Sequence, residues 1–134
     1  MGIDERKGKG KEYNSYNDKL IFEGEYLNGK KFTGKGYDKN GNMIYEIKNG
    51  KGNIKTYYDN GKLKVEREHL NGEKNGKFKE YYDNGILRFE GEYLNGKLNG
   101  KFKGYYDNGK LRFEGEFLNG KPLGKFKVYY NNGI

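Results

Sequence analysis

The residue types that most often perform catalysis are scarce in this chain. His69 is the only histidine, Ser15 is the only serine and cysteine is absent, so no nucleophile with a histidine and an acidic partner is visible. The carboxylates Glu90 and Glu92 could serve acid–base chemistry, but the strand register derived below places a lysine beside each. A neighbouring lysine favours the ionised carboxylate, which indicates a solvated ladder rather than a catalytic pair.

Metal binding is also disfavoured by spacing. One aspartate recurs in each turn of the repeat described below, at Asp59, Asp83 and Asp107. Turns of successive hairpins lie roughly 10 Å apart, which is too far for three carboxylates to share one ion. The sequence therefore predicts no catalytic residue, no metal site, no cofactor and no enzymatic activity.

The lysines suggest a second kind of chemistry, the binding of anions. The chain carries 27 Lys and Arg against 19 Asp and Glu, a formal net charge of +8. An excess of this kind is typical of proteins with anionic partners. The candidate residues are Lys77, Lys79, Lys101 and Lys103. Glutamates are expected to interleave with them, which weakens the positive field, disfavours nucleic acid and leaves anionic phospholipid as the alternative ligand.

The aromatic residues suggest a third kind of chemistry, the binding of a protein. The 14 Tyr and 8 Phe recur at fixed places, and rings rimmed by charge are typical of binding hot spots. The candidate residues are Tyr82, Phe89, Tyr93, Tyr106, Phe113 and Phe117. The alternative is that the rings only pack against one another, since each has aromatic neighbours at cross-strand distance.

These residues must be positioned by a repeated element. The pentapeptide YYDNG ends at Gly61, Gly85 and Gly109, at intervals of 24 residues, and YYNNG ends at Gly133. Residues 75–98 align with residues 99–122 without a gap, and looser or shorter copies precede them. Repeats of this length indicate stacked units that each bury a face against their neighbours. We expect residues 8–134 to form one repeat array, after a flexible basic lead-in over residues 1–7 to which Lys9 and Lys11 also contribute.

Each unit is predicted to be a β-hairpin. Asn-Gly between alternating segments is a strong hairpin signal, because both residues accept the positive φ of a type I′ turn. A two-residue turn at Asn84-Gly85, with Asp83 accepting hydrogen bonds from the turn amides, sets the cross-strand register. The resulting pairs are Lys77–Glu92, Phe78–Gly91, Lys79–Glu90 and Tyr82–Leu87, and the shortened unit keeps Lys35–Glu46. A slip of one residue would destroy these opposite-charge pairs.

The linking Asn95-Gly96 turn extends this register into one meander. The expected pairs across the links are Phe89–Phe102, Glu90–Lys101 and Phe113–Phe126. One face, the aromatic face, carries Phe78, Tyr82, Leu87, Phe89, Tyr93 and their repeats; the other, the Lys/Glu face, carries the lysine and glutamate ladder with Tyr81 and Arg88. Gly91 and Gly115 leave room for the rings of Phe78 and Phe102. The predicted fold is all-β, an antiparallel meander of repeated hairpins in an elongated, twisted single-layer sheet.

The segment FEGEYLNGKLNGKFKGYYDNG, residues 89–109, resembles the MORN repeat. The 24-residue spacing and the YYDNG turn are similar to the bacterial variant grouped with putative antitoxin components. Arg67 and His69 depart from the pattern, where a Gly and an aromatic residue are expected. The resemblance implies a non-catalytic scaffold of stacked hairpins that binds a protein, in an antitoxin-like or immunity-type role, or acidic lipid.

The ends of the chain complete these expectations. Residues 1–19 contain no apolar run, so we expect no signal peptide or transmembrane segment there, and the compartment stays open. The last hairpin is interrupted after its turn, which leaves the strand over residues 124–130 without a partner. Such an edge favours strand addition. Either the sequence is truncated at this point or another chain completes the sheet, and in both cases we expect concentration-dependent self-association through this C-terminal edge.

Overall fold

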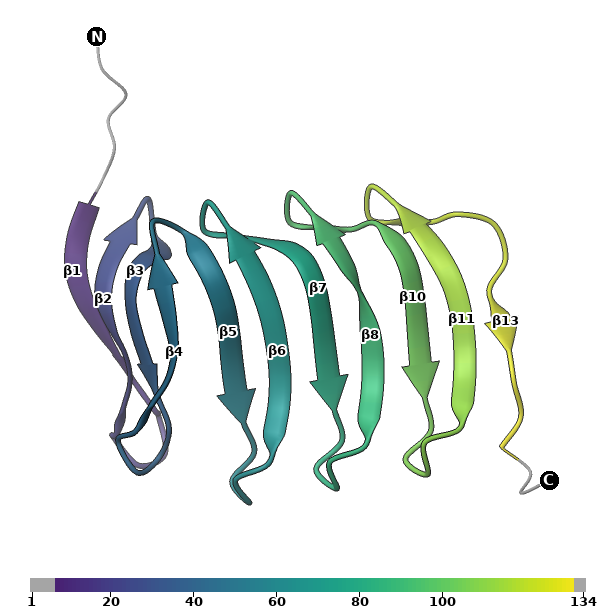
Figure 1. The fold of residues 1–134 in the computed structure, drawn as a ribbon, viewed down its shortest axis with the longest axis horizontal. Coiled ribbons are helices and arrows are strands. Elements are labelled where there is room, and N and C mark those ends of the chain that lie inside the picture. The colour runs from purple at the N-terminus through teal and green to yellow at the C-terminus, as the bar shows by residue number, and fades with distance from the viewer. Residues whose placement is uncertain (1–6, 132–134) are drawn as a thin grey trace, which may run out of the picture. The chain divides into compact units, whose positions relative to one another are not determined.

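The computed structural model describes residues 7–131, which contain β-strands and no helix. The strands are β1 (Lys7–Tyr13), β2 (Leu20–Leu27), β3 (Lys30–Tyr37), β4 (Met43–Lys48), β5 (Lys51–Tyr57), β6 (Leu63–Leu70), β7 (Glu73–Tyr81), β8 (Leu87–Leu94), β9 (Lys97–Leu98), β10 (Gly100–Tyr105), β11 (Leu111–Leu118), β12 (Lys121–Pro122) and β13 (Lys127–Val128). Successive long strands run in opposite directions (Figure 1), in an antiparallel meander. The predicted all-β class and meander are confirmed. No helix that could cross a membrane occurs in this part of the chain.

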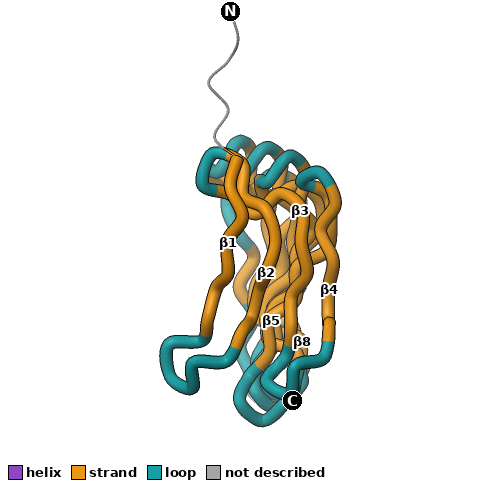
Figure 2. The backbone as a smooth tube through the Cα atoms, turned by 90° about the vertical axis from the view of Figure 1, so that its left-hand side faces the viewer, coloured by secondary structure: helices purple, strands orange, loops and turns teal. Residues whose placement is uncertain are grey.

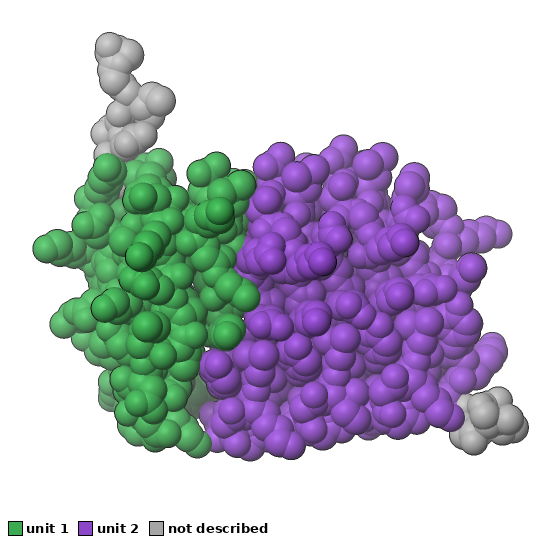
Figure 3. All heavy atoms as spheres, viewed as in Figure 1, with its two compact units in different colours: residues 1–55, 69–73 green, residues 56–68, 74–134 purple. Residues whose placement is uncertain are grey.

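The chain divides into two compact units, coloured separately in Figure 3. Unit 1 comprises Met1–Lys55 and His69–Glu73, and unit 2 comprises Thr56–Glu68 and Lys74–Ile134. Most of the expected lead-in, residues 1–6, lies outside the described residues. The expectation that Lys7, Lys9 and Lys11 belong to a flexible segment is wrong, because all three lie in β1 and pair with β2.

Unit 1 buries its apolar residues in one cluster. Phe22, Tyr45, Ile47 and Ile54 form this core, and Phe22 and Ile47 are almost fully buried, with relative exposures of 0% and 1%. The Phe22 and Tyr45 rings stack with their centroids 6.4 Å apart, although β3 separates their strands. They can do so because Gly36 lies beneath the Tyr45 ring, where a Cβ atom would approach the ring within 2.0 Å. Figure 2 shows β1 to β4 of this unit.

The two kinds of Asn-Gly turn differ, which corrects the sequence interpretation. The linking turns are as expected: Asn95 and Gly96 have φ values of 51° and 85°. In the YYDNG turns only the glycine is left-handed, as Gly85 with φ of 89° shows. Its amide donates to the Tyr82 carbonyl, and the Tyr82 amide donates to the Ile86 carbonyl, which is a three-residue loop with a bulge rather than a type I′ turn.

This loop changes the pairing at the turn end but not along the strands. The expected Lys77–Glu92, Phe78–Gly91 and Lys79–Glu90 pairs are confirmed, as are Lys35–Glu46 and the equivalent pairs of β10 and β11. A register shift follows Glu80, so Leu87 pairs with Tyr81 and not with Tyr82. The side-chain acceptor in the turn is also different: Asn84 Oδ1, rather than the Asp83 carboxylate, accepts the Ile86 amide.

The register across the links is shifted by two residues from the expected one. Glu90 pairs with Lys103 rather than Lys101, and Phe89 pairs with Gly104 rather than Phe102. Similarly, Phe113 pairs with Val128 and not with Phe126. The pairing starts as expected beside the turn, through β8 and β9, and Gly100 with φ of 101° then interrupts it. Because two residues are one side-chain period, the shift keeps each residue on its expected face.

Candidate functional site

Four of the six predicted protein-binding residues belong to one continuous cluster of rings in unit 2. The Phe102 ring contacts three of the predicted residues, with centroid distances of 5.8 Å to Phe89, 5.8 Å to Phe113 and 5.4 Å to Phe117. Tyr93 joins the cluster through Phe78, at 4.9 Å. The predicted list omitted Phe78 and Phe102, although their place on the aromatic face was clear from strand alternation.

All six predicted residues are partly exposed, so the rings are neither sealed nor fully solvated. Within the cluster, Phe78 is the residue that the structure buries. The glycines explain the close packing: a Cβ atom at Gly91 would lie 2.9 Å from both the Phe78 and the Phe102 ring. At Gly115 the expected neighbour was Phe102, but the closest ring is that of Phe126, at 2.4 Å.

The remaining two predicted residues, Tyr82 and Tyr106, have a different environment at the YYDNG turns. Each ring lies under an arginine, with Arg88 at 5.4 Å from Tyr82 and Arg112 at 5.5 Å from Tyr106. The Arg88 guanidinium also lies 5.0 Å from the Phe89 ring. Arg88 was assigned to the Lys/Glu face, so this is a correction: its head group reaches aromatic rings, where a cation is favoured.

The tyrosine pair of YYDNG connects successive hairpins through its hydroxyl groups. The second tyrosine donates to a backbone carbonyl of the next repeat: Tyr82 donates to the Tyr105 carbonyl at 2.6 Å, and Tyr106 to the Tyr129 carbonyl at 2.6 Å. The first tyrosine donates to a glutamate of the preceding repeat, as Tyr105 does to Glu90 at 2.5 Å. The repeated letters therefore specify contacts between units as well as the turn itself.

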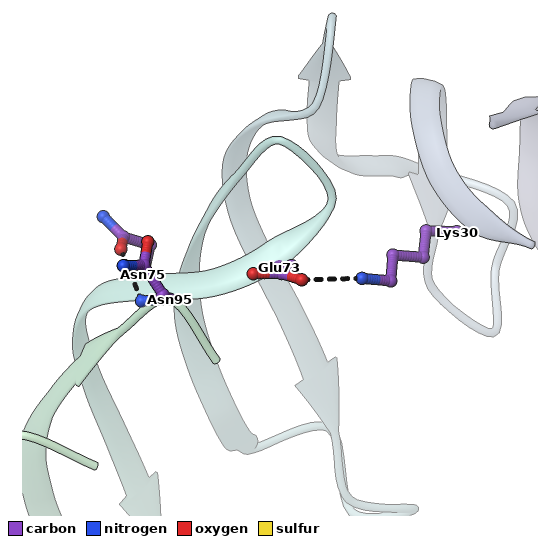
Figure 4. Close-up of polar contacts among 4 residues, drawn as sticks. All are labelled: Lys30, Glu73, Asn75 and Asn95. Atoms are coloured by element: carbon purple, nitrogen blue, oxygen red, sulfur yellow. Dashed lines mark hydrogen bonds and ion pairs between the residues drawn. The ribbon is translucent and has the colours of Figure 1, made fainter. Parts of the chain in front are cut away.

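Asparagines make a second set of contacts between hairpins. In the YYDNG turns, Asn60 Nδ2 donates to the Asp83 carbonyl and Asn84 Nδ2 to the Asp107 carbonyl, at 2.8 and 3.1 Å. At the other end of the hairpins, the Asn75 side chain accepts the Asn95 amide at 3.0 Å (Figure 4). Sequence reasoning missed these contacts, although identical residues at a fixed interval were the available signal.

The Lys/Glu face has the expected backbone register but different side-chain contacts. Among the described residues, the four candidate lysines at positions 77, 79, 101 and 103 form no ion pair. The carboxylates of Glu90 and Glu114 accept tyrosine hydroxyls instead, from Tyr105 and Tyr129. Burial, and then the hydrogen bond and charge of Glu90, raise the pKa of Tyr105 to about 12.

Salt bridges do occur in unit 1. Lys11 pairs with Glu23 at 3.5 Å, and Lys30 pairs with Glu73 at 2.9 Å (Figure 4). These charges are about half exposed, so each pair contributes little to stability, on the order of 0 to 1 kcal/mol.

A shallow hollow of about 450 Å³ lies on the Lys/Glu face of unit 2. Two of the candidate lysines, Lys101 and Lys103, line it together with Glu114 and Glu116. Lys125 and Lys127 add further positive charge, and Leu123 adds an apolar edge. The hollow is therefore of mixed charge with an excess of lysine, and it brings two of the four candidate lysines together.

Residues with catalytic or metal-binding chemistry are not clustered in this part of the chain. Within residues 7–131, no group of three or more His, Cys, Asp or Glu side chains could hold a metal ion. His69 lies at the end of β6, and its Nε2 atom is shielded from solvent.

Comparison with known protein families gives a match over most of the repeats. The family described as MORN repeat variant matches residues 51–71, 74–95 and 98–119, which cover β5 to β11. A search of curated proteins gave no significant match. MORN repeats are generally modules that bind protein or lipid, and the family is typically non-catalytic. Three consecutive hairpin repeats of this chain therefore match the MORN repeat variant.

Proposed function

We propose that the chain is a non-catalytic repeat scaffold that binds a protein partner through the aromatic face of unit 2. The observation that carries this proposal is the continuous ring cluster formed by Phe89, Tyr93, Phe113 and Phe117, in which every one of these side chains stays partly exposed. Rigid rings lose little conformational entropy on binding and offer a large apolar area. Tyr82 and Tyr106 extend this surface to the YYDNG turns.

More specifically, we propose that the scaffold has an antitoxin-like or immunity-type role in a bacterium. The similarity of the 24-residue unit and its YYDNG turn to the bacterial variant of the repeat supports this role. In such a role the partner would be a protein whose activity the scaffold blocks by covering its surface.

The proposal is tested by capturing a partner from the source cells with immobilised protein and then comparing variants. We expect Tyr93→Ala with Phe117→Ala to abolish capture, because both rings lie in the exposed cluster. The control Tyr82→Phe with Tyr106→Phe keeps every ring and loses only the hydroxyls, and we expect it to retain the partner. Each variant must first show the β-sheet circular dichroism spectrum of the parent.

A second candidate function, binding of anionic phospholipid, is favoured by the unpaired lysines. Lys77, Lys79, Lys101 and Lys103 make no ion pair within residues 7–131, and such ammonium groups attract anionic lipid by about 1 kcal/mol each near a membrane. Sedimentation with vesicles of phosphatidylserine and phosphatidylcholine tests this function. Binding that disappears on Lys79→Ala with Lys103→Ala, and within a few hundred millimolar salt, would favour the lipid function over the protein-binding one.

A further inference from the structure

The first repeat of unit 2 carries two basic residues where the next repeats are neutral. Arg67 occupies the position that Gly91 and Gly115 occupy in the following repeats, and Lys74 occupies the position of Leu98. The aromatic face thus has a local difference in charge between otherwise similar units.

Both residues lie on the aromatic face. Glu66 accepts the Tyr81 hydroxyl and Glu68 accepts the Lys77 amide, so these neighbours of Arg67 belong to the Lys/Glu face and Arg67 projects to the opposite side. The Lys74 ammonium lies 5.2 Å from the centroid of the Tyr93 ring. Tyr93 in turn packs on Phe78, with 4.9 Å between the rings.

The two cations have no acidic counterpart within the part of the chain that the structure describes. Neither Arg67 nor Lys74 forms an ion pair with any residue from 7 to 131, and the Nε atom of Arg67 is shielded from solvent with no hydrogen-bond partner. Burial, and then the charge of Arg67, lower the pKa of Lys74. A shielded donor without an acceptor is costly, and a cation beside another cation is disfavoured. An anion that contacts the exposed parts of these two partly exposed side chains would offset the charge of both cations.

We propose that Arg67 and Lys74 bind a carboxylate side chain of the protein partner, beside the rings of Phe78 and Tyr93. The partner segment would therefore carry an acidic residue flanked by apolar ones. The planar guanidinium suits a carboxylate because it can donate two parallel hydrogen bonds. The ring cluster beyond Tyr93 accommodates the flanking apolar side chains. This inference rests on the proposed function, since it names the chemistry of the partner that the aromatic face accepts.

Two peptides that differ only in one charge test the inference. Acetyl-Phe-Glu-Phe-amide and acetyl-Phe-Gln-Phe-amide are titrated into the full chain, and binding is followed by NMR shifts of the Arg67 Nε–H, Lys74 and Tyr93 signals. We expect the Glu peptide to bind at least tenfold more tightly. Equal binding of the two peptides on the aromatic face would overturn the carboxylate site and leave the protein-binding function standing. Failure of both peptides to bind this face would overturn the site and count against that function as well.

Variants drawn from the chain's own repeats provide the matched control. Arg67→Gly and Lys74→Leu install the residues found one repeat later, so we expect both to fold and to remove the preference for the Glu peptide. Lys79→Ala lies on the opposite face and should leave the preference unchanged. A parallel titration with inorganic phosphate tests whether the bound anion is a carboxylate or a phosphate. If phosphate binds as tightly as the Glu peptide, the carboxylate proposal is overturned and the site is assigned to a phosphorylated ligand.

Discussion

Replacing Gly91 by valine tests whether ring packing, rather than strand propensity, determines the glycine positions of the aromatic face. Valine favours strands, and propensity alone predicts a gain of up to about 1 kcal/mol. The structure predicts a loss, because a Cβ atom at this position would lie 2.9 Å from both Phe78 Cε1 and Phe102 Cδ2. Carbon atoms pack at about 3.5 to 4.0 Å, so both rings would have to move by roughly 0.6 to 1 Å, before the valine methyl groups are placed.

The displaced rings have little room. Phe102 contacts Phe78, Phe89, Phe113 and Phe117, with centroid distances between 5.4 and 6.1 Å. Overpacking of this kind costs about 1 to 3 kcal/mol. Subtracting the full propensity gain from the middle of this range leaves a net loss of about 1 kcal/mol in the free energy of unfolding. For a chain of this size that corresponds to a melting temperature lower by roughly 3 to 5 °C.

Thermal unfolding followed by circular dichroism measures this difference, and Gly8→Val is the matched control. Gly8 is also a strand glycine, in β1, but a Cβ atom there would meet nothing within 4 Å. We expect Gly8→Val to melt at the parental temperature or slightly above it. If Gly91→Val melts with the parent, or if both variants fall equally, ring packing over Gly91 is refuted.

Three further predictions concern the hydrogen bonds and turns. The pKa of Tyr105 is raised to about 12 from 10, so the stabilisation that its protonated hydroxyl contributes is present in full below pH 10 and is lost as the pH rises through 12. In urea unfolding from pH 8 to 12, the parent should lose its extra stability over Tyr105→Phe. A difference in stability that stays constant with pH would contradict the Glu90 contact. Asn95→Ala should cost about 1 kcal/mol in chemical denaturation because Asn95 is left-handed, whereas Asn95→Gly should be neutral; equal losses would argue against the type I′ turn. Tyr82→Phe removes the hydrogen bond from the tyrosine hydroxyl to the Tyr105 carbonyl, so it should lower the free energy of unfolding by about 0.5 to 1.5 kcal/mol and increase the rate of amide hydrogen exchange in β10. An unchanged exchange rate would mean that this hydrogen bond does not connect the hairpins.

The sequence was sufficient for the register within each hairpin. Opposite charges at Lys79 and Glu90, together with alternating aromatic residues, allow a single alignment of the two strands. The predicted strand alignment is confirmed although the predicted turn type is wrong, because the register shift after Glu80 compensates for the longer loop. Asn-Gly fits both turn types, and the letters alone do not distinguish Asn84 from Asn95.

The register between hairpins and the contacts of the site were harder to predict. The link register depends on the left-handed conformation of Gly100, which glycine permits but does not require. The hydrogen-bond acceptors of Tyr82 and Asn84 are backbone carbonyls of the next repeat. Because every residue has a backbone carbonyl, no residue type in the sequence identifies these acceptors. The Lys/Glu ladder was predicted as ion pairs, because the competing Tyr105 hydroxyl belongs to a different hairpin from Glu90.

Hydroxyl-radical footprinting of the complex with the captured partner is the most direct test of the claim that the partner binds the aromatic face. Each face carries aromatic side chains, and their oxidation can be measured separately. If the partner binds the aromatic face, Tyr93 and Phe117 become protected, while Tyr81 and Tyr105, whose hydroxyls bind glutamates of the Lys/Glu face, keep their reactivity. Protection of Tyr81 and Tyr105 with Tyr93 and Phe117 unchanged would contradict the account and place the binding surface on the lysine ladder.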